Sequence, residues 1–146
     1  MKRTILSVVL IFAGAILTTV TASTVAAYAA TKNVAEEHGF GVKEYDEFHH
    51  VLRPLQHEAL PAKDFKRIRS RAGLLVALGE AIVKLGVPRG VEEKAAPQFG
   101  ERLKRFNEAL AKFKTDAVSG TDEQLKVSYL VVHDSFETLA EMLPKG

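Results

Sequence analysis

Histidine and carboxylate side chains at helical spacing are the residues of this sequence that could do chemistry. Three of the five histidines fall within nine residues, and a carboxylate stands four positions before the second of them. A fourth histidine stands four positions before a glutamate near the end of the chain. Residues four apart share a helix face, so each acid can bind a metal beside its histidine or orient the imidazole. The candidate metal ligands are His49, His50, His57, His133, Asp46 and Glu137.

Imidazole nitrogen and carboxylate oxygen together are a ligand set that zinc, copper and nickel accept. We therefore predict a divalent transition metal as the cofactor, and haem as the second choice. Two other interpretations stay open, because a histidine between helices is often only hydrogen-bonded to a neighbour, and one near a carboxylate can sense protons. The remaining histidine, His38, lies in a polar stretch and is interpreted as a solvated residue.

The sequence lacks the residues that several other kinds of functional site require. The chain contains no cysteine, which excludes thiolate zinc sites, iron–sulfur ligation, covalently attached c-type haem and a cysteine nucleophile. The G-x-S-x-G, H-E-x-x-H, P-loop and dinucleotide-binding motifs are also missing from the sequence. We therefore expect a protein that is not an enzyme.

The elements that must position the histidines are helices. Apolar residues recur at helical spacing in four segments, and no segment alternates as a strand does. These segments are 44–60, 64–85, 97–119 and 122–143. Because the connections are short, the segments bury their apolar faces most simply as an all-α, antiparallel up-down-up-down four-helix bundle over residues 44–146.

Local signals support these helices. Asp64 is the expected N-cap of the second helix, and Thr121 with Gln124 forms a capping box at the start of the fourth. Gly120 is the expected stop of the third helix. Pro54 interrupts the first helix, so the sequence predicts either a kink at this residue or two separate pieces.

The bundle brings the histidines of the first helix close to His133. Closure places the first helix beside the fourth, and a rise of about 1.5 Å per residue puts His133 at a height between His50 and His57. His50 and His57 share a face nearly opposite the apolar side of their helix. His49 and His133 each flank the apolar face of their own helix. The sequence therefore permits a shared site at the seam between the two helices.

The first thirty residues indicate where the protein works. Lys2 and Arg3 precede an uncharged stretch that ends in small residues, with Ala27 and Ala29 at the positions of an A-x-A cleavage site. We predict a signal peptide over residues 1–30, a flexible leader over 31–43, and a periplasmic or secreted protein. An uncleaved membrane anchor is the alternative. Lys2 and Arg3 account for the whole net charge of +2, so the rest of the chain is neutral. We therefore expect no nucleic-acid partner.

Two surface features bear on partners. Residues 129–132 of the fourth helix are all apolar or aromatic, which indicates either burial on several sides or a homodimer formed through this helix. Five cations lie within residues 63–71 at the start of the second helix. We expect them to pair with acids of the first helix such as Glu47 and Glu58.

An exported bundle of four helices with a histidine on the last helix resembles the cytochrome c′ and cytochrome b562 class of periplasmic proteins. The resemblance covers residues 44–143 and is architectural, since no C-x-x-C-H motif is present. It implies an axial haem ligand at His133. The first helix has no methionine to complete a b562-like pair, so haem would be five-coordinate or would take a second histidine, for which we expect His49 or His50. The segment 48–57, followed by Pro61 and Asp64, is also similar to exported helical proteins without an assigned activity.

Overall fold

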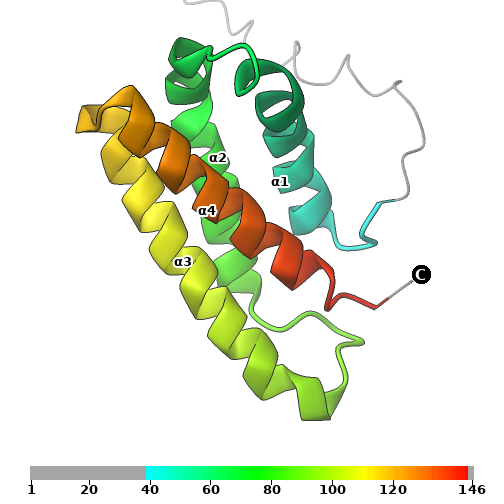
Figure 1. The fold of residues 1–146 in the computed structure, drawn as a ribbon. Helices are drawn as coiled ribbons and strands as arrows, with labels where there is room; N and C mark the ends of the chain where they lie inside the picture. The colour runs from blue at the N-terminus through cyan, green and yellow to red at the C-terminus, as the bar shows by residue number, and fades with distance from the viewer. Residues whose placement is uncertain (1–38, 145–146) are drawn as a thin grey trace, which may run out of the picture. The chain divides into compact units, whose positions relative to one another are not determined.

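The structure is a computed structural model of the 146-residue chain, and it describes residues 39–144. The predicted signal peptide, most of the predicted leader and His38 lie outside the described residues. Within 39–144 the chain is all-helical, as predicted, with four α-helices and no strand (Figure 1). None of the helices in this part of the chain is long and apolar enough to cross a membrane.

The helices fall close to the predicted segments. A π-helical turn, η2, follows the first α-helix directly, and a short 3-10 helix, η3, precedes the third. The fourth α-helix ends three residues earlier than predicted, in a turn that reaches Leu143. The elements are α1 (Lys43–Pro54), η2 (Leu55–Ala59), α2 (Phe65–Leu85), η3 (Glu93–Ala95), α3 (Ala96–Ser119) and α4 (Asp122–Ala140).

At Pro54 the first helix passes directly from α-helical into wider π-helical geometry. Proline has no N–H to donate, and the next N–H, that of Leu55, bonds the carbonyl of Leu52. The chain then continues as η2, where the N–H of Leu60 bonds the carbonyl of Leu55 at 2.9 Å. The Tyr129 hydroxyl of α4 donates to the same Leu52 carbonyl at 3.1 Å. This bond ties the wide turn to α4.

The predicted caps are present. The Asp64 side chain accepts the N–H of Arg67 at 3.0 Å. The side chains of Thr121 and Gln124 each bond the other's backbone N–H, which completes the capping box. Lys63 adopts a positive φ of 55° in the turn before α2, a conformation that glycine accepts more readily. These local signals therefore set the helix starts where the sequence places them.

The core consists of the predicted apolar faces. The residues on the apolar face of α1 and η2 are at most 1% exposed. On α4, Phe136 and its neighbours on the apolar face are fully buried. Leu85 differs, because it is 40% exposed at the end of α2 rather than part of the buried face. The largest fully buried side chains are Tyr45, Tyr129, Phe48, Phe99, Phe106, Phe113, Phe136, Leu52, Leu55, Ile68, Leu75 and Ile82.

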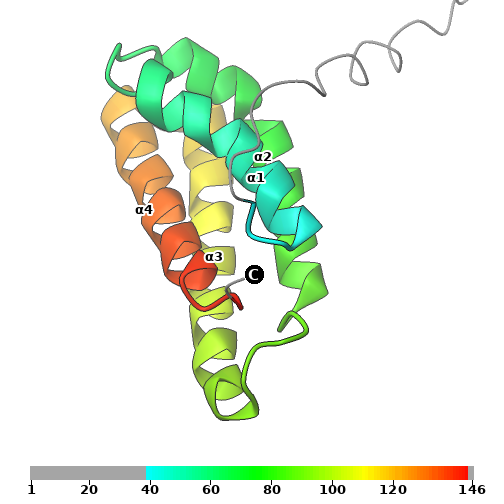
Figure 2. The ribbon, with the colours of Figure 1, turned by 90° about the vertical axis from the view of Figure 1, so that its right-hand side faces the viewer.

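Sequential helices pack against one another, most extensively α3 against α4, which lie side by side in both views (Figures 1 and 2). The helices α1 and α4, predicted neighbours, meet through side chains. The Phe136 ring of α4 contacts the rings of Tyr45, Phe48 and His49 on α1. This aromatic contact surface is where the candidate site lies.

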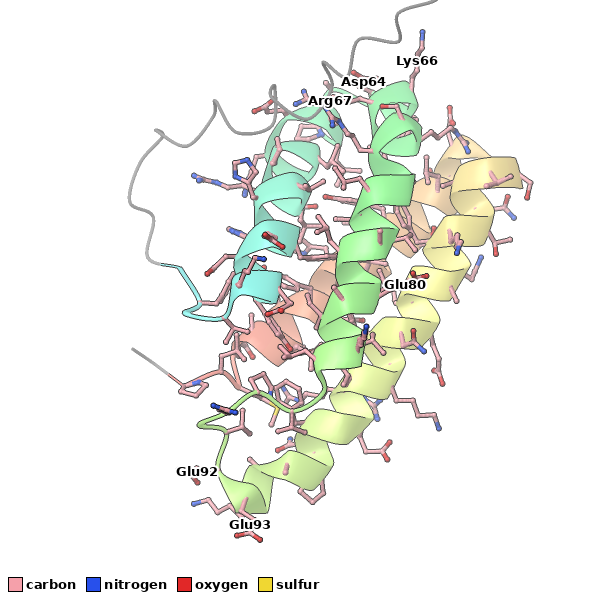
Figure 3. The ribbon with its side chains drawn as sticks, turned by 180° about the vertical axis from the view of Figure 1, so that it is seen from behind. Asp64, Lys66, Arg67, Glu80, Glu92 and Glu93 are labelled. Atoms are coloured by element: carbon pink, nitrogen blue, oxygen red, sulfur yellow. The ribbon has the colours of Figure 1, made fainter. Side chains whose placement is uncertain are left out.

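Arg67 and Arg69, two of the cations at the start of α2, bind different partners. Arg67 pairs with Glu58 at 2.8 Å, as expected, while Lys66 extends away from the helices (Figure 3). Glu47 instead pairs with Lys43 of its own helix at 3.6 Å. Arg69 reaches the other side of α2 and donates to backbone carbonyls at the end of α3. The expected pairing with α1 is therefore only partly correct.

Candidate functional site

His49 lies at the seam between α1 and α4. Its ring is partly buried and lies nearly parallel to the Phe136 ring, with centroids 6.2 Å apart and an interplanar angle of 13°. The Phe40 ring stands edge-on to the imidazole at 5.4 Å. The Phe40 and Phe136 rings also contact each other, at 5.6 Å, so the imidazole and the two rings form one aromatic cluster.

Charged groups from both helices act on His49. Burial lowers the pKa of His49 below its ordinary value, and the carboxylates of Glu137 and Asp46 oppose this effect without cancelling it. His133 and His57 add to the lowering. The predicted ligands of the seam are therefore grouped around one imidazole, and His49 is kept in the neutral form that a metal ion requires.

His133 is oriented by an acid that the sequence analysis did not single out. Its Nδ1 atom lies 3.1 Å from Oδ1 of Asp134, and its Nε2 atom lies 4.0 Å from Oε1 of Glu137. The His133 side chain is 22% exposed. A carboxylate on one ring nitrogen fixes the tautomer and leaves the other nitrogen available as a ligand. Adjacency in the sequence was the only signal for Asp134.

Asp46 has a different partner from the one its spacing indicates. The sequence places it one helical turn before His50, but its Oδ1 atom accepts the backbone N–H of Phe40 at 2.6 Å. The carboxylate still acts electrostatically on His49. Phe40 was missed at the sequence level because a single aromatic residue between Gly39 and Gly41 has no periodicity to mark it.

His50 and His57 share one exposed face, as predicted. Both line an open cavity of about 450 Å³ that is formed only by α1 and η2 residues. The other lining residues are Arg53, Pro54 and Glu58. α4 contributes no residue to this cavity, so the cavity does not bring these two histidines to His133, although His57 still acts electrostatically on His49.

The six predicted ligands thus fall into two groups, the seam group around His49 and the exposed pair. Among residues 39–144, no three such side chains stand in an arrangement ready to hold a metal ion. Comparison with protein-family models, with curated proteins and with solved structures finds no match to this chain.

The lowered pKa of His49 predicts how stability depends on pH. Below its ordinary value of 6.5 the unfolded chain takes up a proton at His49 that the folded chain resists. The free energy of unfolding therefore falls as the pH is lowered from about 7.5 to about 5. His49→Phe keeps a ring between Phe40 and Phe136 and removes the titration.

The measurement is urea denaturation of wild type and His49→Phe across that pH range. The difference between the two proteins at each pH reports the change made at position 49. We expect the variant to gain stability relative to wild type as the pH falls. Parallel stability curves would show that His49 titrates alike in the folded and unfolded states.

Proposed function

We propose that this protein is an exported four-helix bundle that binds a divalent transition-metal ion between α1 and α4, for metal handling or sensing rather than catalysis. In this proposal the helices alternate in direction, and the signal peptide over residues 1–30 directs export. The ligands are His133 and Glu137 from α4 and His49 from α1. Asp46 is close enough to act on the same ion electrostatically.

The arrangement of His133 carries the proposal. Its Nδ1 faces Asp134, and its Nε2 already lies 4.0 Å from a Glu137 oxygen. A tetrahedral zinc ion with bonds of about 2.0–2.1 Å holds two ligand atoms about 3.3 Å apart. The nitrogen and the oxygen therefore need to approach by less than about 1 Å, which side-chain rotation supplies.

His49 supplies the third ligand from the facing helix. Its imidazole is held neutral by burial, and the negative charges of Glu137 and Asp46 act on it across the seam. A cation entering here would meet two carboxylates and two imidazoles. Zinc, copper and nickel all accept this mixed nitrogen and oxygen set.

The test is metal binding by protein produced from the full 146-residue sequence. We expect about one equivalent of zinc, copper or nickel, with His133→Ala and His49→Ala each weakening zinc affinity by about tenfold or more. His50→Ala is the matched control, because it removes an exposed histidine of α1 and should leave zinc affinity unchanged. Equal losses in all three variants, or no uptake of any of the three metals, would overturn the proposal.

Two further readouts separate the related interpretations. N-terminal sequencing of periplasmic protein should find a chain that begins at Ala30 or Thr31, which tests export independently of metal. An absorption spectrum should lack a Soret band. A Soret band that disappears in His133→Ala would instead assign noncovalent haem to the site.

A ligand-free interaction module is the second candidate, and the surface of α4 favours it. Val127 and Val131 lie one helical turn apart and are 52% and 49% exposed. Together they form an apolar strip that a second copy of the helix could cover. If Val131→Glu dissociates a dimer in analytical ultracentrifugation while wild type takes up no metal, this candidate replaces the metal site.

A further inference from the structure

A short segment lies over the His49 side of the seam. Residues 39–42, which we call the strap, precede α1 and carry Phe40 (Figures 1 and 2). The Phe40 ring stands edge-on to the rings of His49 and Phe136, at 5.4 and 5.6 Å. The strap therefore covers part of the imidazole while its aromatic ring packs against the edge of the core.

One polar contact holds the strap beyond the start of α1. The N–H of Phe40 donates to Oδ1 of Asp46 at 2.6 Å. A Cβ atom at Gly39 would lie 3.0 Å from the same oxygen, so a larger residue would push the carboxylate away by a few tenths of an ångström. The anchor is therefore a charge-assisted hydrogen bond that depends on a small neighbour.

The far side of the strap has room to move. Residues 39–42 line a cavity of about 400 Å³ together with Arg89, the end of α4 and the turn that follows it. The strap is thus packed on its His49 side and open on the other. Val42 stays fixed to the first turn of α1, because its carbonyl accepts the N–H groups of Tyr45 and Asp46. Residues 39–41 are held by the Phe40–Asp46 bond and the ring contacts of Phe40, so they can open while Val42 keeps its place.

We propose that the strap is a gate on the α1–α4 metal site and that Asp46 is its latch. The proposal rests on the proposed function for the identity of the ligand. While the Asp46 carboxylate holds the Phe40 N–H, the Phe40 ring shields His49. When the latch opens, the ring leaves and His49 meets solvent and metal. An arriving cation attracts the same carboxylate, so metal entry and release of the strap favour each other.

The gate is tested without metal, by the rate at which diethyl pyrocarbonate modifies each histidine in the full chain. At about pH 8, above the ordinary imidazole range, a slower rate at His49 than at its exposed neighbour His50 reports shielding. We expect His49 to react about tenfold more slowly than His50 in wild type. Asp46→Ala should bring the two rates together.

Three variants make this test specific. Glu47→Ala removes an adjacent exposed carboxylate and should leave the His49 rate unchanged. Gly39→Ala alters no charge, and its Cβ should displace the Asp46 oxygen and raise the His49 rate. Gly100→Ala, where a Cβ meets nothing within 4 Å, is the matched control for Gly39. If Asp46→Ala proves unfolded by circular dichroism, the Gly39→Ala and Gly100→Ala pair decides.

Metal kinetics then connect the gate to the site. We expect zinc to associate with Asp46→Ala about tenfold faster than with wild type, while its equilibrium affinity does not increase. Equal modification rates at His49 and His50 in wild type, or no acceleration in a folded Asp46→Ala or Gly39→Ala, would overturn the gate even if zinc binds. If the protein binds no zinc but the variants are modified faster at His49, the proposed function is overturned and the gate still stands.

Discussion

Replacing Phe136 with alanine is expected to lower the free energy of unfolding by about 4 kcal/mol. The Phe136 ring is fully buried on α4. It contacts the rings of Tyr45 and Phe48 on α1, at 5.8 and 4.7 Å, and that of Phe106 on α3, at 6.4 Å. The space left by the ring would stay unfilled, because filling it would require α1, α3 and α4 to shift together.

Urea denaturation followed by circular dichroism measures this loss. Phe136→Leu is the matched control, since it keeps most of the buried volume and should cost about 1–1.5 kcal/mol. A domain of this size has only about 5–15 kcal/mol to lose. A cost below about 1.5 kcal/mol for the alanine variant would mean that the three helices do not pack around this ring.

The same substitution should also change the candidate site. Phe136 is one of the two rings that shield His49, so its removal admits water and raises the pKa of His49 toward the ordinary value of 6.5. A proton NMR titration of the imidazole measures this shift. An unchanged pKa in a folded variant would show that burial by Phe136 does not cause the lowering.

Removing the guanidinium of Arg69 has the second largest expected effect, a loss of about 3 kcal/mol in Arg69→Ala. The guanidinium, 28% exposed, donates to the carbonyls of Asp116, Ala117 and Gly120 at 3.0, 3.1 and 2.8 Å. The Ala117 and Gly120 carbonyls lie at the end of α3 and just after it, where a helix has no backbone donors for its last carbonyls. The Asp116 carbonyl also accepts the N–H of Gly120, at 2.9 Å. Arg69 also pairs with the Asp122 carboxylate at 2.9 Å in the first turn of α4.

Arg69 therefore joins α2 to the connection between α3 and α4. The planar guanidinium, with several N–H donors, contributes as much to stability as the charge does. Arg69→Lys should recover less than half of the loss, because an ammonium group cannot reach the same carbonyls together. Arg71→Ala removes an exposed cation two residues away and should be nearly neutral. Similar losses in Arg69→Ala and Arg71→Ala would show that only the general charge of α2 contributes.

The sequence alone predicts the helices well, since the period of the apolar residues is a local property. It also identifies the caps at Asp64 and Thr121, whose partners lie within three residues. The wide turn after Pro54 escapes prediction, because it depends on a hydroxyl that Tyr129 offers from 77 residues away. Arg69 escapes for the same reason, as its acceptors lie 47 to 53 residues further along.

The candidate site is predictable only in part. Angular position correctly places His49 and His133 at a seam and His50 with His57 on one exposed face. Spacing does not reveal that the Asp46 carboxylate turns back toward the strap, since that depends on how the preceding residues enter the helix. The i, i+4 spacing places the Asp46 carboxylate near several possible partners but does not determine which of them it binds.

The wide turn formed by η2 also bears on how the length of this chain can vary. A π-helical turn holds about one residue more than an α-helical turn. Loss of one residue from Leu55–Ala59 would return the segment to α-helical geometry, at the expense of the bond between Tyr129 and Leu52. The same loss within α2 would rotate half of its apolar face into water. Insertions and deletions in relatives should therefore concentrate at η2, changing the angle between His50 and His57 while His49 keeps its place against α4.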